Sequence, residues 1–101
     1  MRKILKNNNK SKRMSGYAKG RVGMELNISD KNNIKLKIGD DISYGKYTGV
    51  LLYNPSYDQY GIALDYSLKM GADKYNINSY YKFIEIPMDD GARMDIEKIV
   101  V

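Results

Sequence analysis

A chain of 101 residues predicts a single domain with a modest core. It contains no cysteine and no histidine, which excludes thiolate nucleophiles, cysteine-based metal sites and the usual general base of enzymes. The net charge of +5 is unevenly distributed, because eight Lys or Arg residues precede the first acidic residue, Glu25, and the remainder has nine basic and twelve acidic residues.

The N-terminal segment, residues 1–21, combines this positive charge with little apolar content. Such a composition is typical of a flexible, solvated arm. Ile4 and Leu5 fall far short of the apolar stretch of about 7–15 residues that a signal peptide needs. No run approaches the roughly 20 apolar residues that span a bilayer. We therefore expect a basic arm at 1–21, a folded domain at 22–101, no secretion and no membrane span.

Alternation of apolar and polar residues predicts the first two strands. Residues 22–28 place Val, Met, Leu and Ile on one face, and residues 34–38 place aliphatic side chains inward and lysines outward. The polar segment 29–33 between them has the composition of a turn. Residues 39–41 predict the next turn, and residues 42–44 predict a short third strand.

Two apolar runs at the centre of the chain predict a β-hairpin. One run belongs to a strand at 48–53 and the other to a return strand at 60–66. The segment 54–59 between them, Asn-Pro-Ser-Tyr-Asp-Gln, is rich in turn formers, and its proline cannot donate a ladder hydrogen bond. We expect this hairpin to organise the sheet.

The remaining part of the chain is less regular. Residues 67–80 predict either a loop or, at 67–71, one helical turn closed by glycine. A connection of about 14 residues is long for a compact domain, and such loops are often functional. Residues 81–87 predict a strand that ends at proline, and Asp90-Gly91 predicts a turn. Residues 94–99 fit either a last strand or one helical turn.

Together these elements predict a mainly β protein of five to seven short strands without a long helix. Two architectures satisfy this pattern, a small barrel and a compact antiparallel sheet. A barrel is favoured because closure removes exposed strand edges.

Several short motifs resemble those of known small barrels. Ile38-Gly39-Asp40-Asp41-Ile42 followed by Tyr47-Thr48-Gly49-Val50 resembles the opening of SH3-like barrels, in which a Gly-Asp turn precedes one strand and a second glycine precedes the next. Tyr60-Gly61-Ile62-Ala63 and Asp95-Ile96-Glu97-Lys98-Ile99 are similar to strands of YopX-like proteins of phages and prophages. The resemblance covers roughly the C-terminal two-thirds of the chain. This sequence has no counterpart of the tryptophan-bearing N-terminal part of YopX-like proteins. It implies an SH3-like barrel from a phage or mobile element, located in the cytoplasm of a bacterial host cell, without catalytic residues.

Two kinds of residue are candidate binding contacts. Lys and Arg neutralise phosphates and release counterions, and tyrosines stack on bases or anchor protein interfaces. Tyrosine is also a good strand residue, so most of the ten tyrosines are expected to be structural and those in loops to be contacts. The candidate contacts for a nucleic acid or a protein partner are Arg2, Lys3, Lys6, Lys10, Lys12, Arg13, Lys19, Arg21, Lys46, Tyr57, Tyr75 and Tyr80.

The favoured function is a non-enzymatic binding module that acts on a host or defence protein, for example as an inhibitor of host defence. The alternative is a nucleic-acid-binding regulator that uses the basic arm and a tyrosine-bearing face of the barrel. An enzyme is the least favoured class, because no phosphate-binding loop is present and the acidic residues match no calcium loop. We expect no catalytic residue, no metal ligand and no cofactor, and the oligomeric state is left open.

Overall fold

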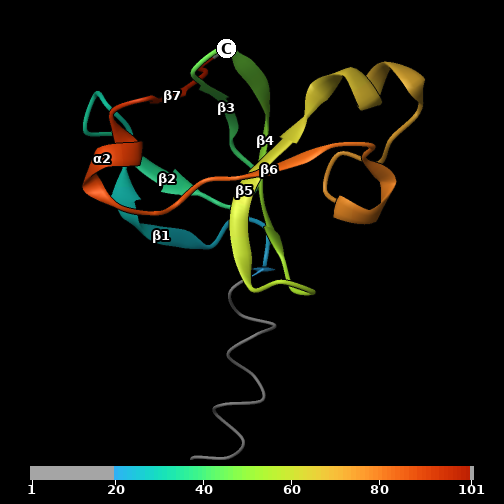
Figure 1. Cartoon of the computed structure of the whole chain (residues 1–101), viewed down its shortest axis with the longest axis horizontal. Coiled ribbons are helices and arrows are strands. Elements are labelled where there is room, and N and C mark those ends of the chain that lie inside the picture. The colour runs from blue at the N-terminus through green and yellow to red at the C-terminus, as the bar shows by residue number, and fades with distance from the viewer. Residues whose placement is uncertain (1–19, 101) are drawn as a thin grey trace, which may run out of the picture.

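The computed structural model describes residues 20–100, which form a mainly β structure with seven strands in two antiparallel sheets (Figure 1). The strands are β1 (Glu25–Ser29), β2 (Lys35–Lys37), β3 (Asp41–Tyr44), β4 (Tyr47–Asn54), β5 (Gln59–Leu64), β6 (Phe83–Glu85) and β7 (Ile96–Lys98). The helices are the 3₁₀ helices η1 (Asp65–Met70) and η2 (Ile77–Ser79) and the single α-helical turn α2 (Asp90–Arg93). The predicted mainly β class is confirmed. The predicted arm, apart from its last two residues, lies outside the described residues.

Five strands form the main sheet in the order β6-β5-β4-β3-β7, and β1 pairs with β2 in a separate hairpin. The predicted central hairpin is confirmed as β4 and β5. Its register runs from Gly49 opposite Leu64 to Asn54 opposite Gln59. Asp58 adopts the left-handed conformation in the connecting turn, with φ of 53°. The turn therefore falls within the predicted segment 54–59.

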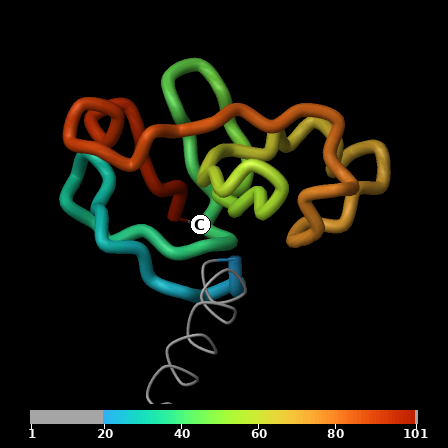
Figure 2. Tube along the Cα trace, turned by 60° about the horizontal axis from the view of Figure 1, so that its bottom comes forward, coloured from blue at the N-terminus to red at the C-terminus, as the bar shows by residue number. Residues whose placement is uncertain are grey.

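The central strand β4 is buried along five consecutive residues, from Gly49 to Tyr53. In both ribbon and trace views, β1, β2 and α2 lie to one side of β4 and β5, whereas η1 and η2 lie to the other (Figures 1 and 2). Both 3₁₀ helices contact β4. A strand that is covered on both faces reads as a continuous apolar run instead of an alternating one, which explains the sequence Gly-Val-Leu-Leu-Tyr.

The strands described here do not close into the favoured barrel, because β6 and β7 end the main sheet and β1 pairs with β2 alone. A pocket of about 340 Å³ is lined by Leu26, Asn27 and Ile28 of β1, by Tyr60 of β5 and by Met88. The arrangement is therefore the compact antiparallel one.

Main-chain hydrogen bonds nevertheless join the β1–β2 hairpin to the main sheet at two places. At the first, Leu51 N donates to Asp40 O at 2.9 Å and Gly39 N donates to Leu51 O at 2.7 Å. At the second, Lys31 N donates to Ile96 O at 2.9 Å. The two sheets consequently share one core, which includes Leu36, Ile38, Ile42, Val50, Ile62 and Ile96.

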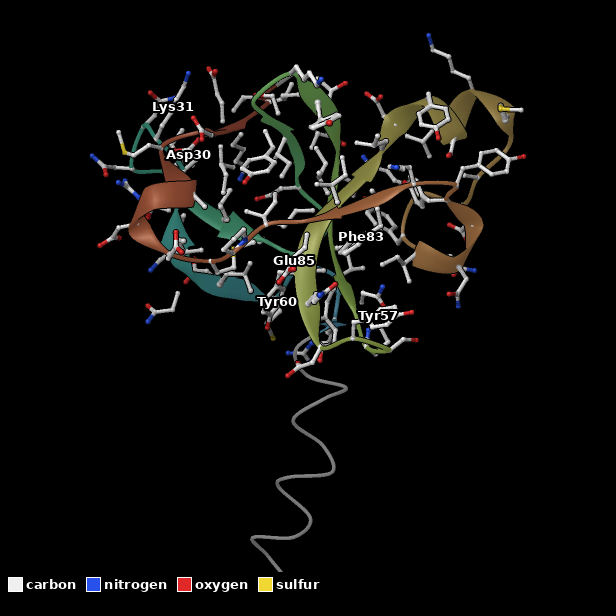
Figure 3. All side chains as sticks on the ribbon, viewed as in Figure 1. Asp30, Lys31, Tyr57, Tyr60, Phe83 and Glu85 are labelled. Carbon is white, nitrogen blue, oxygen red and sulfur yellow. The ribbon has the colours of Figure 1, made fainter. Side chains whose placement is uncertain are left out.

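A fully buried carboxylate, Asp30, also holds the hairpin in place (Figure 3). Its Oδ1 accepts from the backbone N–H groups of Asn32 and Ile34, and its Oδ2 accepts from that of Lys98 in β7. Burial alone raises the pKa of Asp30, but these three donors and the nearby Arg93 guanidinium outweigh it and lower the pKa below its ordinary value. One side chain thus joins the β1–β2 turn to the last strand.

Two local predictions are wrong at element boundaries. The first strand begins at Glu25 and not at residue 22, because a turn in which Met24 N donates to Arg21 O precedes it. Val22 is consequently 44% exposed. The predicted Asp90-Gly91 turn is the start of α2, since the Asp89 side chain caps this helix by accepting from Ala92 N at 2.8 Å.

Two predictions that left alternatives open are resolved. Residues 67–70 belong to the 3₁₀ helix η1, and Gly71 caps this helix in the left-handed conformation with φ of 97°. Of the two alternatives, the helical turn closed by glycine is therefore the one that forms. Within 94–99, residues Ile96–Lys98 form the strand β7, which pairs with β3.

Candidate functional site

Residues 65–82, between β5 and β6, form a lobe that projects from the main sheet (Figures 1 and 2). We call this segment the tyrosine lobe. Its polar groups bond largely to one another: Tyr81 N donates to the buried Ser67 Oγ at 3.0 Å, and the Tyr80 hydroxyl donates to Lys74 O at 2.7 Å. Gly71 N donates to Leu68 O at the end of η1. The long connection is therefore an ordered substructure.

An ion pair and a close packing contact anchor the tyrosine lobe to the body of the protein. Lys74 Nζ lies 3.1 Å from Asp41 Oδ1 in β3. Its hydrogen bond to Asp41 raises the pKa of Lys74, an effect that burial only partly opposes. At Gly39, where φ is 98°, a Cβ atom would lie 2.9 Å from Val22 and 3.2 Å from the Tyr75 ring. A glycine at this corner therefore lets the lobe pack closely.

The tyrosine lobe presents large apolar side chains to solvent. Tyr66, Met70 and Tyr81, which we call the tyrosine patch, are 46%, 67% and 69% exposed. The rings of Tyr66 and Tyr81 stack with their centroids 6.4 Å apart and their planes 19° apart. Aromatic side chains held in one orientation on an ordered segment are the usual anchors of protein interfaces.

A groove of about 600 Å³ lies where the lobe meets the body. We call it the Arg21 groove. It is lined by Gly20, Arg21, Val22, Tyr53, Pro55, Tyr75, Asn76 and Ile77. Arg21 is exposed and is the one charged residue of this lining, and no hydrogen bond or ion pair joins its guanidinium to another residue of the range 20–100. The groove thus combines apolar walls with a cation that is unpaired among residues 20–100.

The phenol of Tyr53, at the wall of the groove, is already engaged. It donates a short hydrogen bond to the Asp58 carboxylate. That bond, together with burial and the carboxylate charge, raises the pKa of Tyr53 to about 12. Tyr53 therefore offers a ring surface to the groove and not a free hydroxyl.

Among the described residues, the predicted contacts Arg21 and Tyr75 line the same groove. Tyr57 is 72% exposed but lies on the β4–β5 turn (Figure 3). Lys46 lies in the turn between β3 and β4, with its ammonium 5.4 Å from the centre of the Tyr47 ring. Tyr80 is half-buried and its hydroxyl is bonded inside the lobe, so its position is structural. The predicted contacts Arg2, Lys3, Lys6, Lys10, Lys12, Arg13 and Lys19 lie outside the described residues.

The sequence analysis did not predict Tyr66 and Tyr81 as surface residues. Tyr66 is the last residue of the predicted strand 60–66, and Tyr81 is the first residue of the predicted strand 81–87. The available signal was their position at the two ends of a long connection. Pairing of β5 with β6 brings those ends together, as Leu64 N donating to Lys82 O shows.

Comparison with protein-family models, curated proteins and solved structures finds no match for this chain. Across residues 20–100, no group of three or more acidic side chains is arranged to hold a metal ion. In the same range, none of the helices has the length and apolar character needed to cross a membrane.

Proposed function

We propose that this chain is a non-enzymatic binding module whose tyrosine patch docks on a partner protein. The observation that carries the proposal is the exposure of Tyr66, Met70 and Tyr81 on an ordered lobe. Burial of a large apolar side chain at an interface contributes about 1.5–3 kcal/mol. Because the two stacked rings are already oriented, little side-chain entropy is lost on association.

The partner that we propose is a host or defence protein in the bacterial cytoplasm, bound by a protein of a phage or mobile element. The support for this choice is the resemblance of residues 38–42 and 47–50 to SH3-like barrels and of residues 60–63 and 95–99 to YopX-like phage proteins. An SH3-like origin of the sheet belongs to the same proposal.

The test is affinity purification of the tagged full-length chain from nuclease-treated bacterial lysate. We expect a discrete host protein to be recovered with the wild type and lost with the double variant Tyr66→Ser/Tyr81→Ser. The control variant Met94→Ser removes an apolar side chain that is 56% exposed next to α2, on the opposite side of the molecule from the lobe (Figure 1). Equal recovery with all three proteins would contradict the proposal.

A nucleic-acid-binding regulator is the second candidate. The observation in its favour is that Arg21 and the exposed ring of Tyr75 line one groove, at the end of the segment that carries eight basic residues. This function predicts that the captured material disappears on nuclease treatment. It also predicts that binding to an oligonucleotide weakens steeply with salt, because phosphate contacts release counterions.

A further inference from the structure

The Arg21 groove differs in chemistry from the tyrosine patch, and this difference points to the kind of segment that it accepts. Its walls are the aliphatic or ring surfaces of Val22, Tyr53, Pro55, Tyr75 and Ile77. A volume of about 600 Å³ falls within the range of about 300–1,000 Å³ that is typical of ligand sites. These walls suit an apolar side chain that inserts from outside.

Charge at the groove defines what surrounds that side chain. Arg21 lines the groove, and its guanidinium forms no hydrogen bond or ion pair with another residue of the range 20–100. Asp41 is paired with Lys74, whereas Asp58 accepts from the neutral Tyr53 hydroxyl and keeps its negative charge. The sequence before Glu25 contains no acid and eight basic residues, which outnumber this carboxylate. Charge complementarity therefore favours an acidic partner segment.

We infer that the Arg21 groove binds an acidic peptide segment of the partner protein, in which an aromatic or large aliphatic side chain enters the groove and a flanking carboxylate pairs with Arg21. This inference deepens the proposed function and rests on it, since it names the chemistry of the partner. An arginine–carboxylate pair forms charge-assisted hydrogen bonds and gives geometric specificity.

The groove is a poorer fit for a nucleobase. Reading a base requires free hydrogen-bonding groups beside a stacking face. The Tyr53 hydroxyl is engaged by Asp58, and Asn76 Oδ1 accepts from Asn78 N at 3.0 Å. The Tyr75 ring has the Lys74 ammonium 5.5 Å from its centre, and it packs towards Gly39 along one edge. Few groups remain to recognise a base, whereas the apolar surface remains open.

The test uses the full-length chain and fluorescence anisotropy with two labelled peptides at about 0.15 M salt. One peptide carries a single phenylalanine between two runs of four glutamates, and the other carries serine in place of that phenylalanine. Both have the same charge, so attraction to the basic segment is matched. We expect the phenylalanine peptide to bind about tenfold more tightly or better, because its ring is buried.

Two charge-reversal variants locate the binding. Arg21→Glu is expected to weaken binding of the phenylalanine peptide about tenfold or more, through loss of the charge-assisted pair. Lys35→Glu makes the same change of net charge at an exposed position of β2, outside the groove lining, and is expected to change affinity less than twofold. Far-UV circular dichroism of both variants checks that the fold is retained.

The inference is overturned if the two peptides bind equally, if neither binds, or if Arg21→Glu and Lys35→Glu have the same effect. It is also overturned if a labelled strand of twelve thymidines binds more tightly than either peptide and depends on Arg21. Failure of this inference can be distinguished from failure of the proposed function. If only the inference fails, the acidic peptide is not bound, but Tyr66→Ser/Tyr81→Ser still abolishes capture of a host protein.

Discussion

Replacement of Asp30 by asparagine tests how the β1–β2 hairpin is fixed to the rest of the protein. The carboxylate is fully buried, and its two oxygens accept from three backbone N–H groups at 2.8, 2.9 and 2.8 Å. Asparagine has the same shape but only one acceptor oxygen. If that oxygen serves Asn32 and Ile34, the amide NH₂ group faces the N–H of Lys98, and two donors then oppose each other.

The expected loss of stability follows from the hydrogen bonds. A bond to a charged group contributes about 1.5–3 kcal/mol and a neutral one about 0.5–1.5 kcal/mol, so the two retained bonds lose about 2 kcal/mol together. The unpaired N–H of Lys98 adds about 1–3 kcal/mol. The free energy of unfolding should therefore fall by about 3–5 kcal/mol, against a typical total of about 5–15 kcal/mol. A loss of 3 kcal/mol would lower Tm by about 12–24 °C.

The assay is urea and thermal unfolding at neutral pH, followed by far-UV circular dichroism. Asp95→Asn is the matched control, because Asp95 is exposed and no hydrogen bond joins its carboxylate to another residue in the described part of the chain. Its effect should stay within about 0.5 kcal/mol. If the two variants unfold at the same midpoint, the buried carboxylate does not hold the hairpin and the reasoning fails.

Three further predictions concern pH and packing. The fold lowers the pKa of Asp30, so the contribution of its carboxylate to the free energy of unfolding is fully present above about pH 4 and is lost as the pH falls through the lowered pKa. The unfolding free energies of wild type and Asp30→Asn should therefore converge in acid. A difference that stays constant with pH would contradict this. Gly61→Ala should cost about 1–3 kcal/mol in chemical denaturation, since its Cβ would overlap the Ile84 carbonyl oxygen; an unchanged midpoint would show that β6 moves aside easily. Tyr53 should ionise near pH 12 because of Asp58, so the contribution of its hydroxyl to the free energy of unfolding is present below about pH 10 and is lost as the pH rises towards 12. The Tyr53→Phe variant should lack this loss of stability at alkaline pH. Wild type and variant with the same dependence of unfolding on pH would refute the prediction.

Local signals were sufficient for the strands near the middle of the chain. The segment 54–59 combines proline with Asn, Asp and Ser, which favour a turn through local interactions that do not depend on the rest of the chain. Alternation at 34–38 predicts which side chains face inward. Leu36 and Ile38 are buried as predicted, whereas Ile34, which precedes β2, is 39% exposed. These features depend on neighbouring residues, so they could be inferred without knowledge of the sheet order.

Element boundaries were predicted wrongly where a single hydrogen bond decides them. The apolar alternation begins at Val22, but a turn at residues 21–24 displaces the strand start to Glu25. The Asp90-Gly91 pair has the composition of a tight turn, but the Asp89 cap makes a helical turn the better solution. In both cases a specific hydrogen bond outweighed a weak local preference.

Local patterns in the sequence were sufficient to predict the mainly β class, the central hairpin and the concentration of positive charge at the start of the chain. Each of these follows from composition or from contacts between residues that are close in the chain. Long-range pairing, in contrast, brings Arg21 and Tyr75 to one groove, stacks Tyr66 on Tyr81 and buries Asp30. These are contacts between segments far apart in sequence, or burial that such contacts create. They depend on which strands pair and on which faces the sheet covers, and that information is absent from any local pattern.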